Sequence, residues 1–173
     1  HNPPEDNGIK LWQPSGQAYD SAGQERITAR LEAGEYDLRA WNELGDRLSA
    51  DGRERHVEAL VEAAGGADAL DLDVAVDLGN GAGGVTVDAL IEAGCAVETL
   101  NAQPDGRFPG RPSEPTEGNC AALAALVDEG SYDLGIAHDG DADRMRAVAG
   151  DGTFLSGDAL LSLFSASAAE AGD

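Results

Sequence analysis

The sequence predicts an α/β fold in which a βαβαβ, mixed but mainly parallel sheet is sandwiched by helices and carries an antiparallel hairpin at its edge. Between residues 73 and 138, three apolar segments of strand length alternate with segments of helical length. This alternation favours right-handed crossovers and hence parallel strands. Further on, two short apolar segments are separated by Asp151-Gly152, which is typical of a hairpin turn. Ligands of such sheets bind beyond the carboxyl ends of the parallel strands.

The amino-terminal part of the chain is less regular than the rest. Its expected elements are turns over residues 1–8, a short strand over 9–12, a helix over 21–33, an irregular stretch over 35–50 and a helix over 51–64. Gly34 ends the first helix, and Asp51 with Glu54 resembles a capping box that begins the second. Gly65-Gly66 follows that helix, and we therefore predict a first domain portion over residues 1–68.

The remaining residues are expected to form the sheet and its covering helices. The strands are expected at 73–78, 96–100, 133–138, 145–149 and 153–155, and the helices at 84–93, about 117–129 and 157–170. A glycine-rich turn, Gly79–Gly84, connects the first strand to its helix, and Thr116 is the expected cap of the following helix. The predicted domain limits are 69–153 for the sheet domain and 154–173 for the last helix.

Acidic residues dominate the composition, with 33 Asp and Glu against 11 Lys and Arg and a net charge of −22. This charge argues against nucleic acids and anionic membrane surfaces as partners, and no run of 18 apolar residues predicts a membrane span. Apolar periodicity survives between the acids, which argues against disorder. We therefore predict a halophilic protein whose acidic surface must be screened by salt, and full folding in dilute buffer would contradict this prediction.

Cys95 and Cys120 have no CxxC spacing, so neither a zinc site nor a disulfide framework is predicted. Cys95 opens an apolar strand and Cys120 lies in a helical pattern, and both are expected to be small buried residues. The sequence also lacks the basic and apolar segments of a secretory signal. These features predict a reducing, cytoplasmic location.

Asp139-Gly140-Asp141-Ala142-Asp143-Arg144 directly follows an apolar segment and concentrates three carboxylates in a short stretch. By Coulomb's law, each pair of such charges costs about 1 kcal/mol in water and roughly 4 kcal/mol near a protein surface. A hard divalent cation held by oxygen ligands would offset this repulsion. We therefore expect a metal site formed by Asp139, Asp141 and Asp143. The plainer interpretation is a solvated acidic turn.

Other acidic and glycine-rich motifs fit the chain less well or stay open. An EF-hand loop starting at Asp139 needs Gly at its sixth and Glu at its twelfth position, where the chain has Arg144 and Gly150. A phosphatase with an aspartate nucleophile at the strand end stays open, because Arg144 suits a phosphate clamp in either case. Gly79-x-Gly81-x-x-Gly84 matches a dinucleotide fingerprint, but a tight strand-to-helix turn is the favoured interpretation.

Lys10 is the only lysine of the chain, and every other basic side chain, histidine aside, is an arginine. A sequence that is almost free of lysine has kept one at a single position. We therefore expect the ammonium group of Lys10 to have a function.

The run Gly135–Arg144 resembles the metal loop of the α-D-phosphohexomutases, the phosphomannomutase/phosphoglucomutase superfamily. Residues 1–10 are similar to the segment directly after the phosphorylated serine of that family, and Asp77–Gly83 and Asp105–Pro109 also resemble family stretches. The resemblance covers the whole chain in order. It implies a four-domain parent enzyme, of which this chain would hold the end of domain 1, domain 2 and the helix that leads into domain 3.

The resemblance also implies roles for individual residues. Mg²⁺ would be held by a phosphoserine oxygen and by Asp139, Asp141 and Asp143. Arg144 would contact the phosphoryl group, and His1 would flank the reacting serine. Lys10 would act as a general acid/base or charge stabiliser near the sugar hydroxyl, so the solitary lysine falls on a family active-site position.

The implied activity is that of an intramolecular phosphotransferase that interconverts hexose 1-phosphate and hexose 6-phosphate, of mannose or glucose, through a phosphoserine and a bisphosphorylated sugar. A phosphoglucosamine mutase is the alternative within the family, and a non-catalytic acidic module that binds divalent cations is the alternative of another class. The expected partners are a phosphorylated hexose and the remaining domains of the parent chain. The family serine would directly precede His1, and the loops of domains 3 and 4 are not in the sequence, so we expect these 173 residues alone to be inactive.

Overall fold

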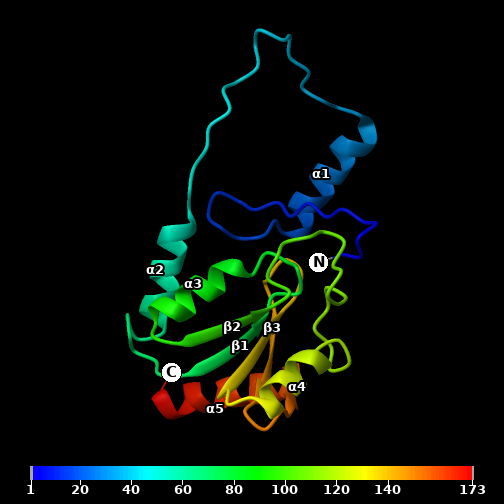
Figure 1. Ribbon diagram of the computed structural model, residues 1–173. Helices are drawn as coiled ribbons and strands as arrows, with labels where there is room; N and C mark the ends of the chain where they lie inside the picture. Colours follow the sequence, from blue (N-terminus) through cyan, green and yellow to red (C-terminus); the bar gives the residue numbers. More distant parts are fainter. Residues whose placement is uncertain (1, 173) are drawn as a thin grey trace. The chain divides into compact units, whose positions relative to one another are not determined.

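The computed structural model describes residues 2–172 and contains a five-stranded sheet with helices around it (Figure 1). The chain divides into two compact units. The smaller unit is Gly8–Asp51, and the larger unit consists of the residues up to Asn7 together with those from Gly52 onwards. The whole sheet belongs to the larger unit.

The sheet has the strand order β2-β1-β3-β4-β5. Its strands are β1 (Asp73–Asp77), β2 (Ala96–Leu100), β3 (Leu134–His138), β4 (Met145–Ala149) and β5 (Phe154–Leu155). β1 pairs in parallel with β2 and β3, whereas β4 pairs antiparallel with β3 and β5. This arrangement confirms the predicted α/β fold with a mixed sheet and an antiparallel edge hairpin.

Helices cover both faces of the sheet because successive side chains of a strand point to opposite faces. The helices of the larger unit are α2 (Arg53–Ala63), α3 (Gly84–Glu92), α4 (Ala121–Glu129) and α5 (Gly157–Ala171). Ala75 of β1 packs on the α4 side, whereas Val74 and Val76 pack on the α3 side. α2 packs against α3 through Val57 and Val61. Within residues 2–172, no helix has the length and apolar character needed to cross a bilayer.

The helix of the smaller unit is α1 (Ser21–Ala33), and it has the predicted bounds. Its amino end is capped by Asp20, whose carboxylate accepts a hydrogen bond from the Gly23 amide at 2.7 Å. Its carboxyl end is closed by Gly34, which has a left-handed φ of 65° that favours glycine. Residues 35–50 contain no helix or strand, as predicted.

Two predicted elements are wrong in extent. Residues 9–12 do not form a strand, because the segment makes only an isolated bridge between Trp12 and Ala18 and a strand needs partners along its length. The helix predicted from residue 117 begins four residues later as α4. The Thr116 hydroxyl accepts from the Asn119 amide at 3.3 Å, so it closes a turn ahead of the helix.

The capping box predicted at the start of α2 is also wrong. The N-cap position is occupied by Gly52, which has no side chain to offer, and the helix begins at Arg53. The division into compact units falls at this point, between Asp51 and Gly52. The domain limit at residue 68 stays a prediction.

Cys95 and Cys120 are buried free thiols, as expected. Burial raises the pKa of both thiols above its ordinary value, and the thiolate is the reactive form. We therefore expect neither cysteine to react with Ellman's reagent in the folded protein at mildly alkaline pH, and both to react after unfolding in urea. Rapid modification of the folded protein would show that the surrounding helices open readily.

Candidate metal centre

Two loops meet at the carboxyl ends of the parallel strands. β1 and β3 end side by side, because Asp77 pairs with Ala137 in parallel register. β1 leads into Gly79–Gly84, the glycine loop, and β3 leads into Asp139–Arg144, the acidic loop. The Ala82 amide donates to the Gly140 carbonyl at 3.1 Å, so the two loops are in direct contact. This is the edge at which ligands bind in sheets of this type.

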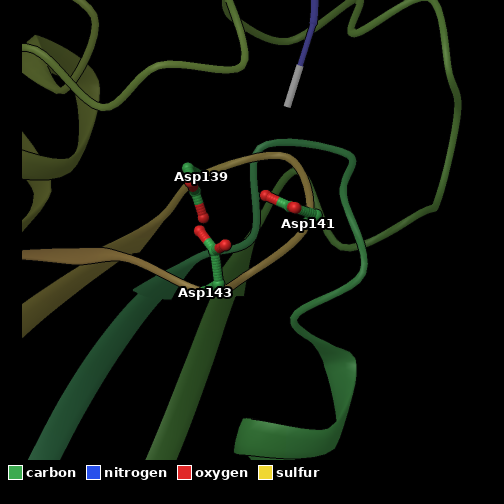
Figure 2. Close-up of side chains that lie close together, drawn as sticks. All are labelled: Asp139, Asp141 and Asp143. Atoms are coloured by element: carbon green, nitrogen blue, oxygen red, sulfur yellow. The ribbon is translucent and has the colours of Figure 1, made fainter. Parts of the chain in front are cut away.

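The three aspartates of the acidic loop direct their carboxylates toward one another (Figure 2). One oxygen from each of Asp139, Asp141 and Asp143 lies within 4.8 Å of the others. An octahedral Mg²⁺ with ligands at about 2.0–2.1 Å holds its oxygens about 3–4 Å apart, so the set fits this ion after a small inward movement. Asp139 is completely buried, whereas Asp141 and Asp143 are exposed and are able to make that movement.

The acidic loop is closed by a tight turn of the backbone. The Ala142 amide donates to the Asp139 carbonyl at 3.2 Å, and the Asp139 amide donates to the Arg144 carbonyl at 3.3 Å. Ala142 has a φ of 58°, in the left-handed region, which costs a non-glycine residue roughly 1–2 kcal/mol. This turn brings both ends of the loop together and directs the carboxylates inward.

Arg144 compensates the charge of the buried carboxylate. Its Nε donates to Asp139 Oδ2 at 3.0 Å, and its backbone amide donates to Asp139 Oδ1 at 3.1 Å. The outer end of the guanidinium donates from Nη2 to Glu114 Oε2 at 2.9 Å. Hydrogen bonds to Glu114 and, to a smaller extent, to Asp139 raise the pKa of Arg144, so its guanidinium stays protonated. A carboxylate oxygen has more than one acceptor site, so Asp139 is still able to bind a cation.

Two glycines of the glycine loop allow this close approach. A Cβ placed on Gly81 would lie 2.5 Å from the Gly140 carbonyl oxygen, and one on Gly83 would lie 3.0 Å from the His138 ring. His138 is buried, and burial lowers the pKa of its imidazole, which favours the neutral form. The sequence predicted a tight turn at this place, but the contact between the two loops was not visible in it.

A buried ion pair beneath the loops was missed by sequence reasoning. Arg111 donates from Nε to Asp77 Oδ2 at 2.7 Å, and its side chain and that of Asp77 are 4% and 2% exposed. Asp77 Oδ1 also accepts from the Gly79 amide and from Asn101 Nδ2, both at 2.9 Å. An aspartate at the end of an apolar strand was the one available signal, because Arg111 is distant in sequence and lies in an irregular segment.

Comparison with known proteins places this sheet and its loops in a family. Residues 54–152, more than half of the chain, match the family model described as phosphoglucomutase/phosphomannomutase, alpha/beta/alpha domain II. The chain belongs to the phosphoglucomutase/phosphomannomutase family. The resemblance drawn from the acidic loop is therefore confirmed at the level of the family.

Two relatives from archaea are similar to nearly the whole of this chain. A "probable phosphoglucosamine mutase" from Methanosarcina barkeri is 47% identical over 167 residues, which are 95% of this chain and 38% of the relative. Another protein with the same name, from Methanothermobacter thermautotrophicus, is 43% identical, and the match covers 94% of this chain and 36% of that relative. The chain thus spans a little over a third of the length of these relatives.

A solved structure of the family shares the fold. A crystal structure of a phosphoglucomutase/phosphomannomutase family protein from Burkholderia thailandensis gives a TM-score of 0.77 at 28% identity. The match covers 95% of this chain and 35% of the other. The α/β architecture is therefore that of known phosphoglucomutase/phosphomannomutase family members.

The other two predicted site residues, Lys10 and His1, are not part of the acidic loop. Lys10 is in the Gly8–Asp51 unit, where it is exposed and lines a hollow of about 540 Å³ together with Trp12 and Tyr19. His1 lies outside the described residues. The structure thus brings together the four predicted residues of the acidic loop, while the roles of Lys10 and His1 stay predictions.

Proposed function

We propose that the acidic loop binds Mg²⁺ and that this chain forms the metal-binding part of a phosphohexomutase. The observation that supports the proposal is the convergence of three carboxylates, with one oxygen from each within 4.8 Å of the others, at the carboxyl edge of the sheet. Such a cluster is unfavourable without a counter-charge, and oxygen ligands are those that Mg²⁺ prefers.

The residues of the loop have distinct parts in this proposal. Asp139 is the rigid ligand, because it is buried and held by Arg144. Asp141 and Asp143 are exposed ligands that close on the ion. The Arg144 side chain bonds to Asp139 and Glu114 and is 42% exposed, and its guanidinium would contact a phosphoryl group next to the metal. Bound Mg²⁺ would make phosphorus more electrophilic and neutralise developing charge.

The reaction proposed for the whole protein follows from the family resemblance. A phosphoserine gives its phosphoryl group to a hexose phosphate, the bisphosphate reorients, and the other phosphoryl group returns to the serine. His1 flanks the reacting serine, and Lys10 holds or moves a proton at the sugar hydroxyl. We further infer that the remaining domains of the parent chain cover the Gly8–Asp51 unit, in which Leu38 and Trp41 are each 86% exposed.

We favour a glucosamine phosphate as the substrate over a mannose or glucose phosphate, because relatives more than 40% identical carry the name phosphoglucosamine mutase. Together with whatever further domains it has, the protein should therefore interconvert glucosamine 1-phosphate and glucosamine 6-phosphate with a higher kcat/KM than the glucose or mannose phosphates. A coupled assay with the three substrate pairs decides between them. A preference for mannose or glucose phosphate would restore the first prediction.

Metal binding tests the proposed site directly on this chain. We expect the wild-type chain to bind one Mn²⁺, measured by electron paramagnetic resonance, and Mg²⁺ to displace it. Asp141→Asn should weaken binding about 10-fold to 100-fold, because it removes one of three anionic ligands; changes around metal sites have effects of this size. The titration should be made in molar KCl, where the diffuse acidic surface is screened.

The matched control is Asp71→Asn, which removes the same charge from an exposed residue just before β1, at the opposite end of the strand from the acidic loop. This variant should bind Mn²⁺ as the wild type does. Equal and small effects of the two substitutions would indicate diffuse cation attraction and would favour a non-catalytic acidic module.

A further inference from the structure

We propose that Arg111 is a positioning residue for the acidic loop, tying the ends of β1 and β3 together and thereby holding the backbone from which Asp139 projects. The inference rests on the metal site proposed above and adds a residue to that site. Arg111 lies in the irregular segment between β2 and α4, about 30 residues from either strand end in sequence.

The side chain of Arg111 donates hydrogen bonds to three residues. Nε donates to Asp77 Oδ2 at 2.7 Å, at the end of β1. Nη2 donates to the His138 carbonyl at 2.6 Å, at the end of β3, and Nη1 donates to the Pro112 carbonyl at 3.0 Å. His138 is the residue immediately before Asp139, so the guanidinium holds the peptide unit that starts the acidic loop.

Stability alone does not account for a buried pair of this kind. Arg111 and Asp77 are almost fully buried, with side-chain exposures of 4% and 2%. The desolvation of two buried charges offsets most of their attraction, and apolar residues of similar volume often stabilise a fold as well or better. The geometry, in contrast, is specific to arginine, because its planar fork spans two acceptors and a lysine ammonium does not.

The surroundings of the guanidinium are shaped to receive it. A Cβ on Gly79 would lie 2.8 Å from the guanidinium carbon, so the glycine loop leaves the space that Arg111 fills. Arg107 in the same segment provides a contrast, because its side chain is 85% exposed and pairs with the nearby Asp105. Only one of these two arginines is built into the edge that carries the metal loop.

The test is Arg111→Lys, which keeps the charge next to Asp77 but loses the reach to the His138 carbonyl. We expect Arg111→Lys to weaken Mn²⁺ binding by at least about 10-fold, as for other residues that support metal ligands. In the metal-free protein, hydrogen exchange should become faster at the Ala142 and Arg144 amides, both of which bond to Asp139. Exchange at the Ala149 amide, which bonds to Thr153 in the β4–β5 hairpin, should not change.

Two further variants separate positioning from stability. Arg107→Lys is the matched control and should change neither readout. Asp77→Asn combined with Arg111→Met removes both charges and keeps the site filled with uncharged side chains, so the fold should persist. Mn²⁺ binding by this double variant should be about 10-fold weaker than that of the wild type.

Wild-type Mn²⁺ affinity together with wild-type exchange in folded Arg111→Lys would overturn the proposal, and so would full Mn²⁺ affinity in the folded double variant. If the wild-type chain binds no Mn²⁺, the metal proposal fails, whereas the exchange rates of the metal-free proteins still decide the role of Arg111.

Discussion

Asp77→Ala should lower the free energy of unfolding of the sheet unit by about 3–5 kcal/mol, because it leaves the guanidinium of Arg111 buried without a counter-charge. The pair is nearly inaccessible to water, which therefore provides little compensation. The Gly79 amide and the Asn101 side chain lose their acceptor in the same change. Urea unfolding followed by far-ultraviolet circular dichroism measures the effect. Tryptophan fluorescence is unsuitable, because Trp12 and Trp41 lie in the Gly8–Asp51 unit.

The matched control for this change is Asp88→Ala. Asp88 accepts from Arg53 Nε at 2.7 Å, but both side chains are about half exposed, so water and salt replace the lost partner. Exposed ion pairs contribute about 0–1 kcal/mol, and we expect a loss within that range. Similar losses in the two variants would contradict the special cost assigned to the buried pair.

Gly81→Ala should disturb both stability and metal binding. The new methyl group would lie 2.5 Å from the Gly140 carbonyl oxygen, which is backbone and has no rotamer into which it could move. One of the two loops must therefore shift. We expect a loss of about 1–3 kcal/mol, as for other overpacked sites, and about 10-fold weaker Mn²⁺ binding, because the acidic loop starts next to this contact. Urea unfolding and the Mn²⁺ titration measure the two effects.

Gly84→Ala is the control within the same glycine loop. A Cβ at Gly84 meets no atom within 4 Å, and Gly84 is the first residue of α3. Alanine is favoured over glycine in helices by up to about 1 kcal/mol, so this variant should be as stable as the wild type or more stable. A loss equal to that of Gly81→Ala would show that the glycines matter for the turn itself and not for the contact with Gly140.

The sequence alone was sufficient for features that depend on neighbouring residues. The alternation of strand and helix predicted the α/β fold, and Gly34 predicted the end of α1 because a left-handed residue closes a helix. The convergence of Asp139, Asp141 and Asp143 was also predictable, since residues within one turn cannot lie far apart. One wrong prediction was likewise local: a capping pattern at Asp51 preceded a glycine N-cap, because the side chain that matches a motif need not occupy the cap position.

The features that sequence reasoning missed join residues that are far apart in the chain. Asp77 and Arg111 are 34 positions apart, and Glu114 and Arg144 are 30 apart. The contact of Gly81 with Gly140 depends on β1 and β3 being adjacent and in one register. The spacing of residues along a chain does not show which strands become neighbours, because the packing of the whole sheet sets the strand order. The amino-acid sequence therefore determined which carboxylates could hold a metal. The folded sheet determined that Arg111 bonds to the residue before Asp139.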